Sequence, residues 1–233
     1  MCWESNSSSR LWRQPPQGGG IGGLVGAGRS ELVEGIFGMH ELASGEIFVK
    51  GKQVKVHSPK DIIKEGVALI TEDRKVTGLN LSGSVNDNIA MVAIKKLLSH
   101  GLYNKNKARA ASMEYIKKLN IKTPSGDQIT GNLSGGNQQK IVIAKWLLND
   151  PDVIILDEPT RGIDVGAKRD IYLLLGKLVQ QGKAVIMISS EIPELMGVCD
   201  RIMVMCEGNL SGEVQRDAFS QERIMTLASA IEV

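Results

Sequence analysis

A short apolar strand that ends in two carboxylates, close behind a serine and glycine helix start, constrains this chain more than any other feature. Residues 153–156 form the strand, and Asp157 and Glu158 follow it directly. Upstream runs the stretch Leu133-Ser134-Gly135-Gly136-Asn137-Gln138-Gln139-Lys140. The start of a helix presents unpaired N–H groups and the positive end of the helix dipole, and glycine lets an anion approach the backbone. Together the two motifs predict a nucleotide-phosphate site with a metal ion and a base.

The spacing of apolar residues after residue 20 predicts an α/β fold with a mainly parallel sheet. Helices at 84–98 and 105–119 predict a helical subdomain over about residues 80–140. Residues 1–20 lack any periodicity and predict a disordered segment before a domain at 21–233. The other expected elements are strands at 67–71, 153–156 and 184–188, hairpins at 45–54 and 201–214, and helices at 30–37, 192–198 and 220–231.

Composition excludes several classes of function. The 233 residues are 42% hydrophobic, enough for a sizeable core, and the net charge of +2 gives no electrostatic case for nucleic acid. Little aromatic character is interleaved with the lysines of the helical subdomain, which favours a solvated helix face. No apolar run approaches the ~18 residues needed to cross a bilayer. Three unpaired cysteines and an N-terminus without the apolar core of a secretory signal are typical of a cytoplasmic protein.

A glycine-rich loop predicts a second phosphate site. Gly23-Leu24-Val25-Gly26-Ala27-Gly28-Arg29-Ser30 fits the pattern G-x-x-x-x-G-K-[ST], except that Arg29 replaces lysine. The backbone N–H groups of the loop suit phosphate, and the Ser30 hydroxyl suits Mg²⁺. Arg29 keeps the positive charge but brings a longer planar fork, so we expect nucleotide binding to survive the replacement better than catalysis. The alternative is a glycine-rich turn that binds nothing.

The two carboxylates can take separate roles, because adjacent residues on an extended segment face opposite ways. Asp157 would hold Mg²⁺, directly or through water, and Glu158 would orient or deprotonate the attacking water. The alternative is a pair of exposed turn acids before Pro159, which the apolar strand in front of them disfavours.

These motifs make residues 21–233 resemble a nucleotide-binding domain of the ABC transporter family. Residues 133–138 resemble the family signature, residues 153–158 its Walker B strand, and residues 162–164 its D-loop. A finer pattern is similar to the second half of bacterial sugar-import ATPases of the ribose, galactose and xylose group. It comprises residues 26–30, 72–75, 137–140, 159–168 and 189–194.

The resemblance implies a shared ATP site and several partners. Two such domains stack head to tail, so that the phosphate loop of one and the signature helix of the other hold each ATP. The implied ligands are ATP and Mg²⁺. The implied partners are a second ABC nucleotide-binding domain (in the same polypeptide in the family), membrane permease subunits and, indirectly, a periplasmic or extracellular sugar-binding protein, but no nucleic acid. The protein would be cytoplasmic and peripheral on the inner face of the cell membrane.

Four departures from the family pattern bear on the chain's own phosphate site. Arg29 replaces lysine, Glu72 replaces the Q-loop glutamine, Ser190 replaces the switch histidine, and residues 1–20 do not resemble the opening strands. Glu72 can still bind Mg²⁺ but repels phosphate, and Ser190 either contacts the γ-phosphate or caps the next helix. Without the opening strands the antiparallel β subdomain would be incomplete, and a truncated or frame-shifted reading frame is an alternative.

The sequence therefore predicts an ATPase domain of a bacterial sugar importer, weak in its own site, whose signature motif completes the ATP site of a partner domain. The alternatives are a nucleotide-binding regulatory module with negligible hydrolysis, a non-functional gene fragment, and an ABC-type ribosome or nucleic-acid factor, which the low net charge disfavours. The candidate residues are as follows: catalytic, Glu158 and Ser190; nucleotide-binding, Gly23, Gly26, Ala27, Gly28, Arg29, Ser30, Glu31, Leu133, Ser134, Gly135, Gly136, Asn137, Gln138 and Asp164; metal-binding, Ser30, Glu72 and Asp157.

Overall fold

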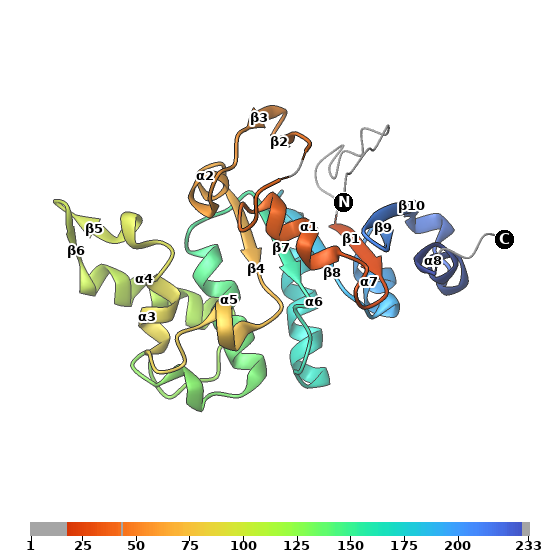
Figure 1. Ribbon diagram of the computed structural model, residues 1–233. Coiled ribbons are helices and arrows are strands. Elements are labelled where there is room, and N and C mark those ends of the chain that lie inside the picture. Colours follow the sequence, from red (N-terminus) through yellow and green to blue (C-terminus); the bar gives the residue numbers. More distant parts are fainter. Residues whose placement is uncertain (1–17, 43, 230–233) are drawn as a thin grey trace. The chain divides into compact units, whose positions relative to one another are not determined.

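The computed structural model describes residues 18–42 and 44–229, which form two compact units (Figure 1). The sheet unit comprises residues 1–69, 152–158 and 176–233. The helical unit comprises residues 70–151 and 159–175. The chain therefore leaves the sheet unit after residue 69, returns to add one strand, leaves again after Glu158 and returns within a long helix.

A six-stranded sheet forms the centre of the sheet unit, in the order β10, β9, β1, β8, β7, β4. β1 is parallel to both β8 and β9, and β7 is parallel to β8, whereas β9 and β10 pair antiparallel. The prediction of an α/β fold with a mainly parallel sheet is confirmed. The strands are β1 (Gly18–Gly23), β4 (Val67–Ile70), β7 (Val153–Asp157), β8 (Ala184–Ile188), β9 (Arg201–Cys206) and β10 (Asn209–Gln215).

The parallel strands bring several candidate residues to one edge of this sheet. In the strand register, Ile21 lies opposite Ile188, and Ile188 lies opposite Asp157. The carboxyl ends of β1, β7 and β8 are therefore nearly level. The glycine-rich loop, the two acids and the serines at 189–190 all leave the sheet from this edge, which is where parallel α/β sheets bind ligands.

Strand β1 has the sequence GGGIGG, and the neighbours of Gly20 and Gly22 come close to the space that a side chain would need. A Cβ at Gly20 would lie 3.0 Å from Cys199 Sγ and 3.3 Å from Leu195 Cδ2. Residues 18–20, which the sequence places in the disordered segment, instead pair with β8 and β9. The rest of that predicted segment, residues 1–17, lies outside the described part of the chain.

Helices and a separate hairpin complete the sheet unit. The hairpin of β2 (Ile47–Val49) and β3 (Lys52–Val54) turns at Lys50 and Gly51, as the sequence predicts, and forms a two-stranded sheet of its own. Ser58 and Asp61 form a capping box at the start of α2 (Pro59–Lys64). The other helical elements are α1 (Arg29–Ile36), α7 (Ile192–Val198), α8 (Gln221–Ala228), the end of α6 (Val165–Gln180) and a 3₁₀ turn at Arg216–Ala218.

The helical unit is built around α5 (Gly135–Leu147), which is buried along most of its length. Ile141, Ile143 and Ala144 are each 0% exposed. The subdomain expected at about residues 80–140 falls inside this unit. Its other elements are α3 (Val85–Ala90), α4 (Lys105–Lys118), the start of α6, a π-helical turn at Arg74–Gly78, and 3₁₀ turns at Ile94–Leu97 and Thr130–Asn132.

The helix expected at residues 84–98 is wrong in its second half. α3 ends at Ala90, and β5 (Leu98–Ser99) pairs with β6 (Leu102–Tyr103) in a hairpin. The hairpin turns at His100 and Gly101, whose φ angles of 50° and 81° are incompatible with a continuing helix. The apolar pattern of residues 91–98 suits a helix equally well, so the pattern alone does not show the break.

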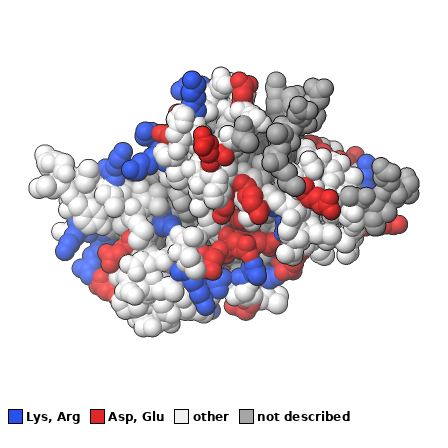
Figure 2. Space-filling model, in the orientation of Figure 1, with Lys and Arg blue, Asp and Glu red and all other residues white. Residues whose placement is uncertain are grey.

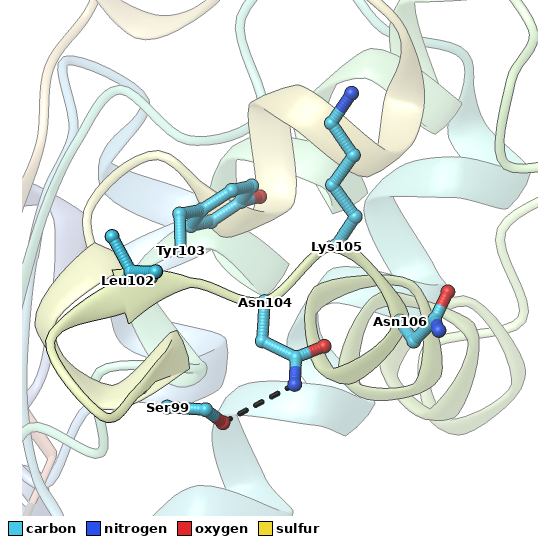
Figure 3. A pocket seen from close by; sticks show the side chains of 6 residues that line it. All are labelled: Ser99, Leu102, Tyr103, Asn104, Lys105 and Asn106. Atoms are coloured by element: carbon cyan, nitrogen blue, oxygen red, sulfur yellow. Dashed lines mark hydrogen bonds between the residues drawn. The ribbon is translucent and has the colours of Figure 1, made fainter.

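Asn104 connects this hairpin to α4. Its Nδ2 donates to Ser99 Oγ at 3.2 Å (Figure 3), and its Oδ1 accepts from the Lys107 N–H at 3.0 Å. The same segment lines a hollow formed by Ser99, Leu102, Tyr103, Asn104, Lys105 and Asn106. Because the Asn104 amide is already used to cap α4, we ascribe a structural role to this hollow.

Asn88 holds three segments of the helical unit together. Its side chain is 0% exposed, and its Oδ1 accepts from the Asn80 N–H at 2.8 Å. Its Nδ2 donates to the carbonyls of Asn80 and Ser84 and to the Thr130 hydroxyl, at 2.8–3.0 Å. Both hydrogens of the amide nitrogen and one lone pair of its oxygen are thus used.

We expect Asn88→Ala to destabilise the helical unit by about 3 kcal/mol, because several buried polar groups lose their partner at about 1–3 kcal/mol each. Denaturant unfolding combined with hydrogen exchange in α3 measures the loss. Asn106→Ala, on the exposed side of α4, is the matched control and should change stability by less than about 0.5 kcal/mol. Equal effects of the two substitutions would contradict this account.

Charges of both signs are mixed on the visible face of the molecule (Figure 2). Lysine and arginine form separate groups with acidic residues between them, not one continuous basic stripe. The lysines of α4 at 105, 107, 117 and 118 are exposed, as expected for a solvated helix face. Within residues 18–42 and 44–229, no helix combines the length and the apolar character required to cross a membrane.

Candidate functional site

The glycine-rich loop leads directly from β1 into α1. Gly26 and Gly28 have φ angles of 82° and 87°, where a side chain would be strained. A Cβ at Gly28 would lie 3.1 Å from Gly208 Cα, and the Gly208 N–H donates to the Ala27 carbonyl at 3.0 Å. Apart from its chain neighbours, no atom of the described residues lies within 4 Å of a Cβ built at Gly26. The β9–β10 turn therefore supports one side of the loop, and the other side leaves the backbone accessible to a ligand.

The start of α1 is suited to an anion. Its N-cap is Gly28, which has no side chain to cap the first N–H groups of the helix. Ser30 is half-buried in the first turn, and Glu31 beside it is exposed. Free N–H groups at the positive end of a helix dipole attract phosphate. Phosphate binding at residues 23–31 stays a prediction, and this geometry is compatible with it.

Asp157, at the end of β7, is only 3% exposed. Burial raises the pKa of its carboxyl from 3.8 to about 6, while a hydrogen bond from Ser30 lowers the pKa and the charge of Glu158 raises it further. Its Oδ1 is buried and has no hydrogen-bond partner in the described part of the chain. A buried carboxylate oxygen without a partner, beside a serine hydroxyl, fits Mg²⁺.

Such an ion would take its other ligands from water and phosphate. No group of three or more His, Cys, Asp and Glu residues in the described ranges is arranged to hold a metal. Mg²⁺ characteristically uses one or two protein carboxylates and completes its octahedron with water and substrate oxygens. Ser30 and Asp157 are therefore sufficient as the protein ligands of such a site.

Glu158 is held in a left-handed backbone conformation, with φ of 45°. Its N–H donates to the Ile188 carbonyl at 3.0 Å. Its Oε1 accepts from the Ser190 N–H at 2.6 Å, and Ser189 Oγ lies 3.4 Å from its Oε2. The end of β8 thus fixes the direction of this carboxylate. A strained conformation that the surroundings maintain is typical of functional sites.

Arg29 turns its guanidinium toward Glu158. Its Nη2 lies 3.6 Å from Glu158 Oε1, and the two side chains are 9% and 11% exposed. Its Nη1 is also buried but has no hydrogen-bond partner within residues 18–42 and 44–229. The sequence analysis misses this ion pair, because nothing in the spacing of residues 29 and 158 indicates a contact, and only the strand order brings them together.

Ser189, which the sequence does not single out, supports the turn before α7, whose N-cap residue is Glu191. Its Oγ accepts from the Glu191 N–H at 3.0 Å and lies 3.3 Å from Glu194 Oε2. For Ser190, the sequence leaves two roles open, which are a cap on the next helix and a contact with γ-phosphate. Its backbone N–H donates to Glu158 Oε1. The Ser190 side chain is exposed, so a contact with γ-phosphate stays a prediction.

In the helical unit, the predicted signature motif begins α5. Ser134 is the exposed N-cap, and its hydroxyl accepts from Asn137 Nδ2 at 2.9 Å instead of capping the helix. Asn137 Oδ1 accepts from the Lys122 N–H at 2.8 Å. Gln138 is buried and donates to carbonyls within residues 130–133 at 3.1–3.4 Å. Asn137 and Gln138 therefore shape the motif, whereas Ser134 remains at the surface.

The two signature glycines lie against neighbouring segments of the helical unit. A Cβ at Gly136 would lie 2.5 Å from the Ala167 Cβ on α6. A Cβ at Gly135 would lie 2.8 Å from Arg74 Nη2 and 3.2 Å from the Gly162 carbonyl oxygen. Glycine is therefore required here for packing as well as for access to the backbone.

Two arginines connect the predicted Q-loop region to the predicted D-loop region. Arg161 forms an ion pair with Glu72, and Arg74 donates to the carbonyls of Arg161 and Gly162 at 2.9 and 3.3 Å. Asp164 accepts from the Ala167 N–H at 2.9 Å and so caps α6. Both arginines lie in segments of the sugar-importer pattern, but nothing in that pattern indicates their contacts, which span more than 80 residues.

The candidate residues thus fall into two groups, one in each unit. The sheet unit joins Arg29, Ser30, Asp157, Glu158 and the backbone of Ser190. The helical unit contains Glu72, the signature residues 133–138 and Asp164. The metal role predicted for Glu72 stays a prediction, since its partner in the structure is an arginine.

The chain is similar in sequence to known proteins. The family model described as ABC transporter matches residues 14–161. The ribose import ATP-binding protein of Clostridium tetani is 51% identical over 212 residues, which are 91% of this chain and 42% of that protein. The ribose import ATP-binding protein of Lactococcus lactis is 48% identical, over 90% of this chain and 43% of that protein. The chain spans about two fifths of the length of these relatives.

Solved structures support the fold. A dimeric ATP-binding cassette in a post-hydrolysis state, bound to ADP and phosphate, superposes with a TM-score of 0.74 at 21% identity and covers 88% of each chain. A part of an ABC transporter complex from Clostridium perfringens superposes with a TM-score of 0.73 at 24% identity, over 93% of this chain and 84% of that one. Because the family model covers well over half of its residues, the chain belongs to the ABC transporter family.

Proposed function

We propose that this chain is an ATP-binding domain of a bacterial sugar importer, in which ATP binding and hydrolysis drive carbohydrate uptake. The observation that carries the proposal is the cluster of Ser30, Asp157 and Glu158 beside an open glycine loop. The names of the relatives, which are ribose import ATP-binding proteins, support ribose or a similar sugar as the cargo.

Within the sheet unit, each residue of the cluster has a separate task. The N–H groups of residues 26–31 bind the phosphates, and Ser30 and Asp157 hold Mg²⁺, which neutralises phosphate charge when bound. Glu158 orients the attacking water and accepts its proton, because its carboxylate is fixed by Ser190 at the edge of the sheet. The exposed side chain of Ser190 contacts the γ-phosphate.

The signature motif acts on a second nucleotide-binding domain. Ser134 is exposed at the start of α5, where the helix dipole and free N–H groups suit the γ-phosphate of an ATP bound to that partner. Membrane permease subunits, and indirectly a sugar-binding protein, complete the importer. The domain then works peripherally on the inner face of the membrane.

The second candidate is a regulatory module that binds nucleotide with negligible hydrolysis. The Arg29–Glu158 ion pair favours it, because the base carboxylate is engaged by a cation. The intact Asp157 and Glu158 favour residual hydrolysis. A nucleic-acid factor receives no comparable support, since the charges on the visible face are mixed in sign (Figure 2).

Glu158→Gln separates the two candidates. We expect the isolated chain to release phosphate from Mg-ATP slowly, and the substitution to lower this turnover by about tenfold or more, because the general base is lost. Thermal shift with Mg-ADP measures binding independently of turnover. Glu191→Gln, which neutralises an exposed carboxylate at the start of α7, is the control and should retain turnover.

Each outcome of this experiment has one meaning. Nucleotide binding without turnover in the unmodified chain would support the regulatory module. No nucleotide binding at all would overturn the proposed function. Salt-sensitive RNA binding would instead favour the nucleic-acid factor.

A further inference from the structure

The strongest feature that the proposed function leaves unexplained is the divided environment of the Arg29 guanidinium. One edge of the group faces Glu158, with Nη2 3.6 Å from Oε1. The other edge, at Nη1, is buried and has no hydrogen-bond partner among the residues that the structure describes. The residue as a whole is only 8% exposed. A buried donor without a partner costs about 1–3 kcal/mol of stability. We therefore expect Arg29 Nη1 to donate to an acceptor on a bound ligand.

The chemistry of that acceptor follows from what surrounds Arg29. The residue opens α1 immediately after the glycine-rich loop, where N–H groups and the helix dipole favour an anion. A guanidinium carries donors on two separate edges and can bind two acceptors at once, whereas a lysine ammonium is a compact point charge. A phosphate oxygen is the acceptor that this position offers.

We propose that Arg29 bridges Glu158 and a nucleotide phosphate, so that nucleotide binding and the position of the base carboxylate are coupled through one side chain. This inference rests on the proposed function and adds a positioning role that also restrains turnover. With Nη2 on its carboxylate, Glu158 is less available to accept a proton from water. The chain's own site then holds nucleotide well and hydrolyses it slowly.

The surroundings of Glu158 keep the pair together. Its φ of 45° and the 2.6 Å hydrogen bond from the Ser190 N–H prevent the carboxylate from turning away. Asp157, which is adjacent, is engaged by Ser30 and leaves Glu158 as the ion-pair partner of the guanidinium. Neutralising Glu158 should therefore free Arg29 for the phosphate, and this effect requires the arginine.

A double-mutant cycle on ADP affinity tests the bridge without relying on turnover. We expect Glu158→Gln to tighten Mg-ADP binding by about tenfold in the unmodified chain, but by no more than about threefold in the Arg29→Lys background. Arg29→Lys alone should change ADP affinity by less than about threefold while raising kcat by a similar factor or more. Titration of a fluorescent ADP analogue and phosphate release provide the two readouts.

A nearby carboxylate controls for a general charge effect. Glu34 lies on α1, close enough to influence the titration of Asp157, but pairs with His40 and not with Arg29. Glu34→Gln should change ADP affinity by less than about twofold. Equal tightening by Glu158→Gln in both backgrounds overturns the bridge and leaves the proposed function intact. Absence of ADP binding in the unmodified chain overturns both.

Discussion

Asp157→Asn should make the nucleotide-free protein more stable by up to about 3 kcal/mol at about pH 7.5, although it removes a residue of the candidate metal site. Burial raises the pKa of this carboxyl from 3.8 to about 6. A difference of one pKa unit corresponds to about 1.4 kcal/mol between the two protonation states. The folded protein therefore carries an energetic cost whenever Asp157 is charged.

The stability difference between the unmodified chain and Asp157→Asn should depend on pH. Because the folded-state pKa is higher than the unfolded-state value, the folded protein binds the extra proton between about pH 3.8 and 6. The contribution of Asp157 to stability is present below this window and is lost as the pH rises through it. Denaturant unfolding of the two proteins should thus differ little at about pH 4 and most above about pH 6.5.

Nucleotide should reverse the order of stability. Mg-ADP stabilises the unmodified chain by binding only its folded state, and Asp157→Asn should lose most of that stabilisation. Asp152→Asn is the matched control, since Asp152 directly precedes the same strand but is half-exposed and pairs with Lys50 at 2.5 Å. It should change stability by less than about 1 kcal/mol at any pH. If nucleotide-free Asp157→Asn is less stable than the unmodified chain at neutral pH, the raised pKa of Asp157 is contradicted.

The fold was predictable where the chemistry is local. The capping position of Asp164, the strand before Asp157 and the turn at Gly51 each follow from neighbouring residues. The hairpin at residues 98–103 was not predictable, because MVAIKKLL has a helical period and only the turn after it breaks the helix. The start of β1 was missed for the opposite reason, since three glycines resemble a linker until close neighbours explain them.

The candidate site could likewise be predicted only in part from the sequence. The motifs identified Ser30, Asp157 and Glu158, and the structure places them together at one edge of the sheet. The neighbouring residues that form ion pairs and hydrogen bonds with these side chains could not be predicted from the sequence. Arg29 was recognised as a departure from lysine, but its contact with Glu158 depends on the strand order. Contacts between residues more than 80 positions apart leave no local pattern to detect.

Gly136→Ala should abolish most of the signature motif's effect on a partner domain. The added Cβ would lie 2.5 Å from the Ala167 Cβ, a distance that requires the starts of α5 and α6 to separate. Overpacking of this kind costs about 1–3 kcal/mol. Because a donor at a developing charge is worth about a hundredfold or more in rate, we expect a loss of that order in the ATPase activity of the assembled importer.

A second substitution distinguishes a packing fault from a chemical one. Ala167→Gly removes the methyl group that Gly136→Ala meets, so the double variant should recover both the stability of the helical unit and most of the ATPase activity. Ala167→Gly alone should cost no more than about 1 kcal/mol, as expected for glycine in a helix. Gly135→Ala offers a contrast, because its nearest neighbour is the flexible end of Arg74. If the double variant is as inactive as Gly136→Ala, the added methyl group blocks the partner's nucleotide directly, and the packing of α5 against α6 is not what positions Ser134.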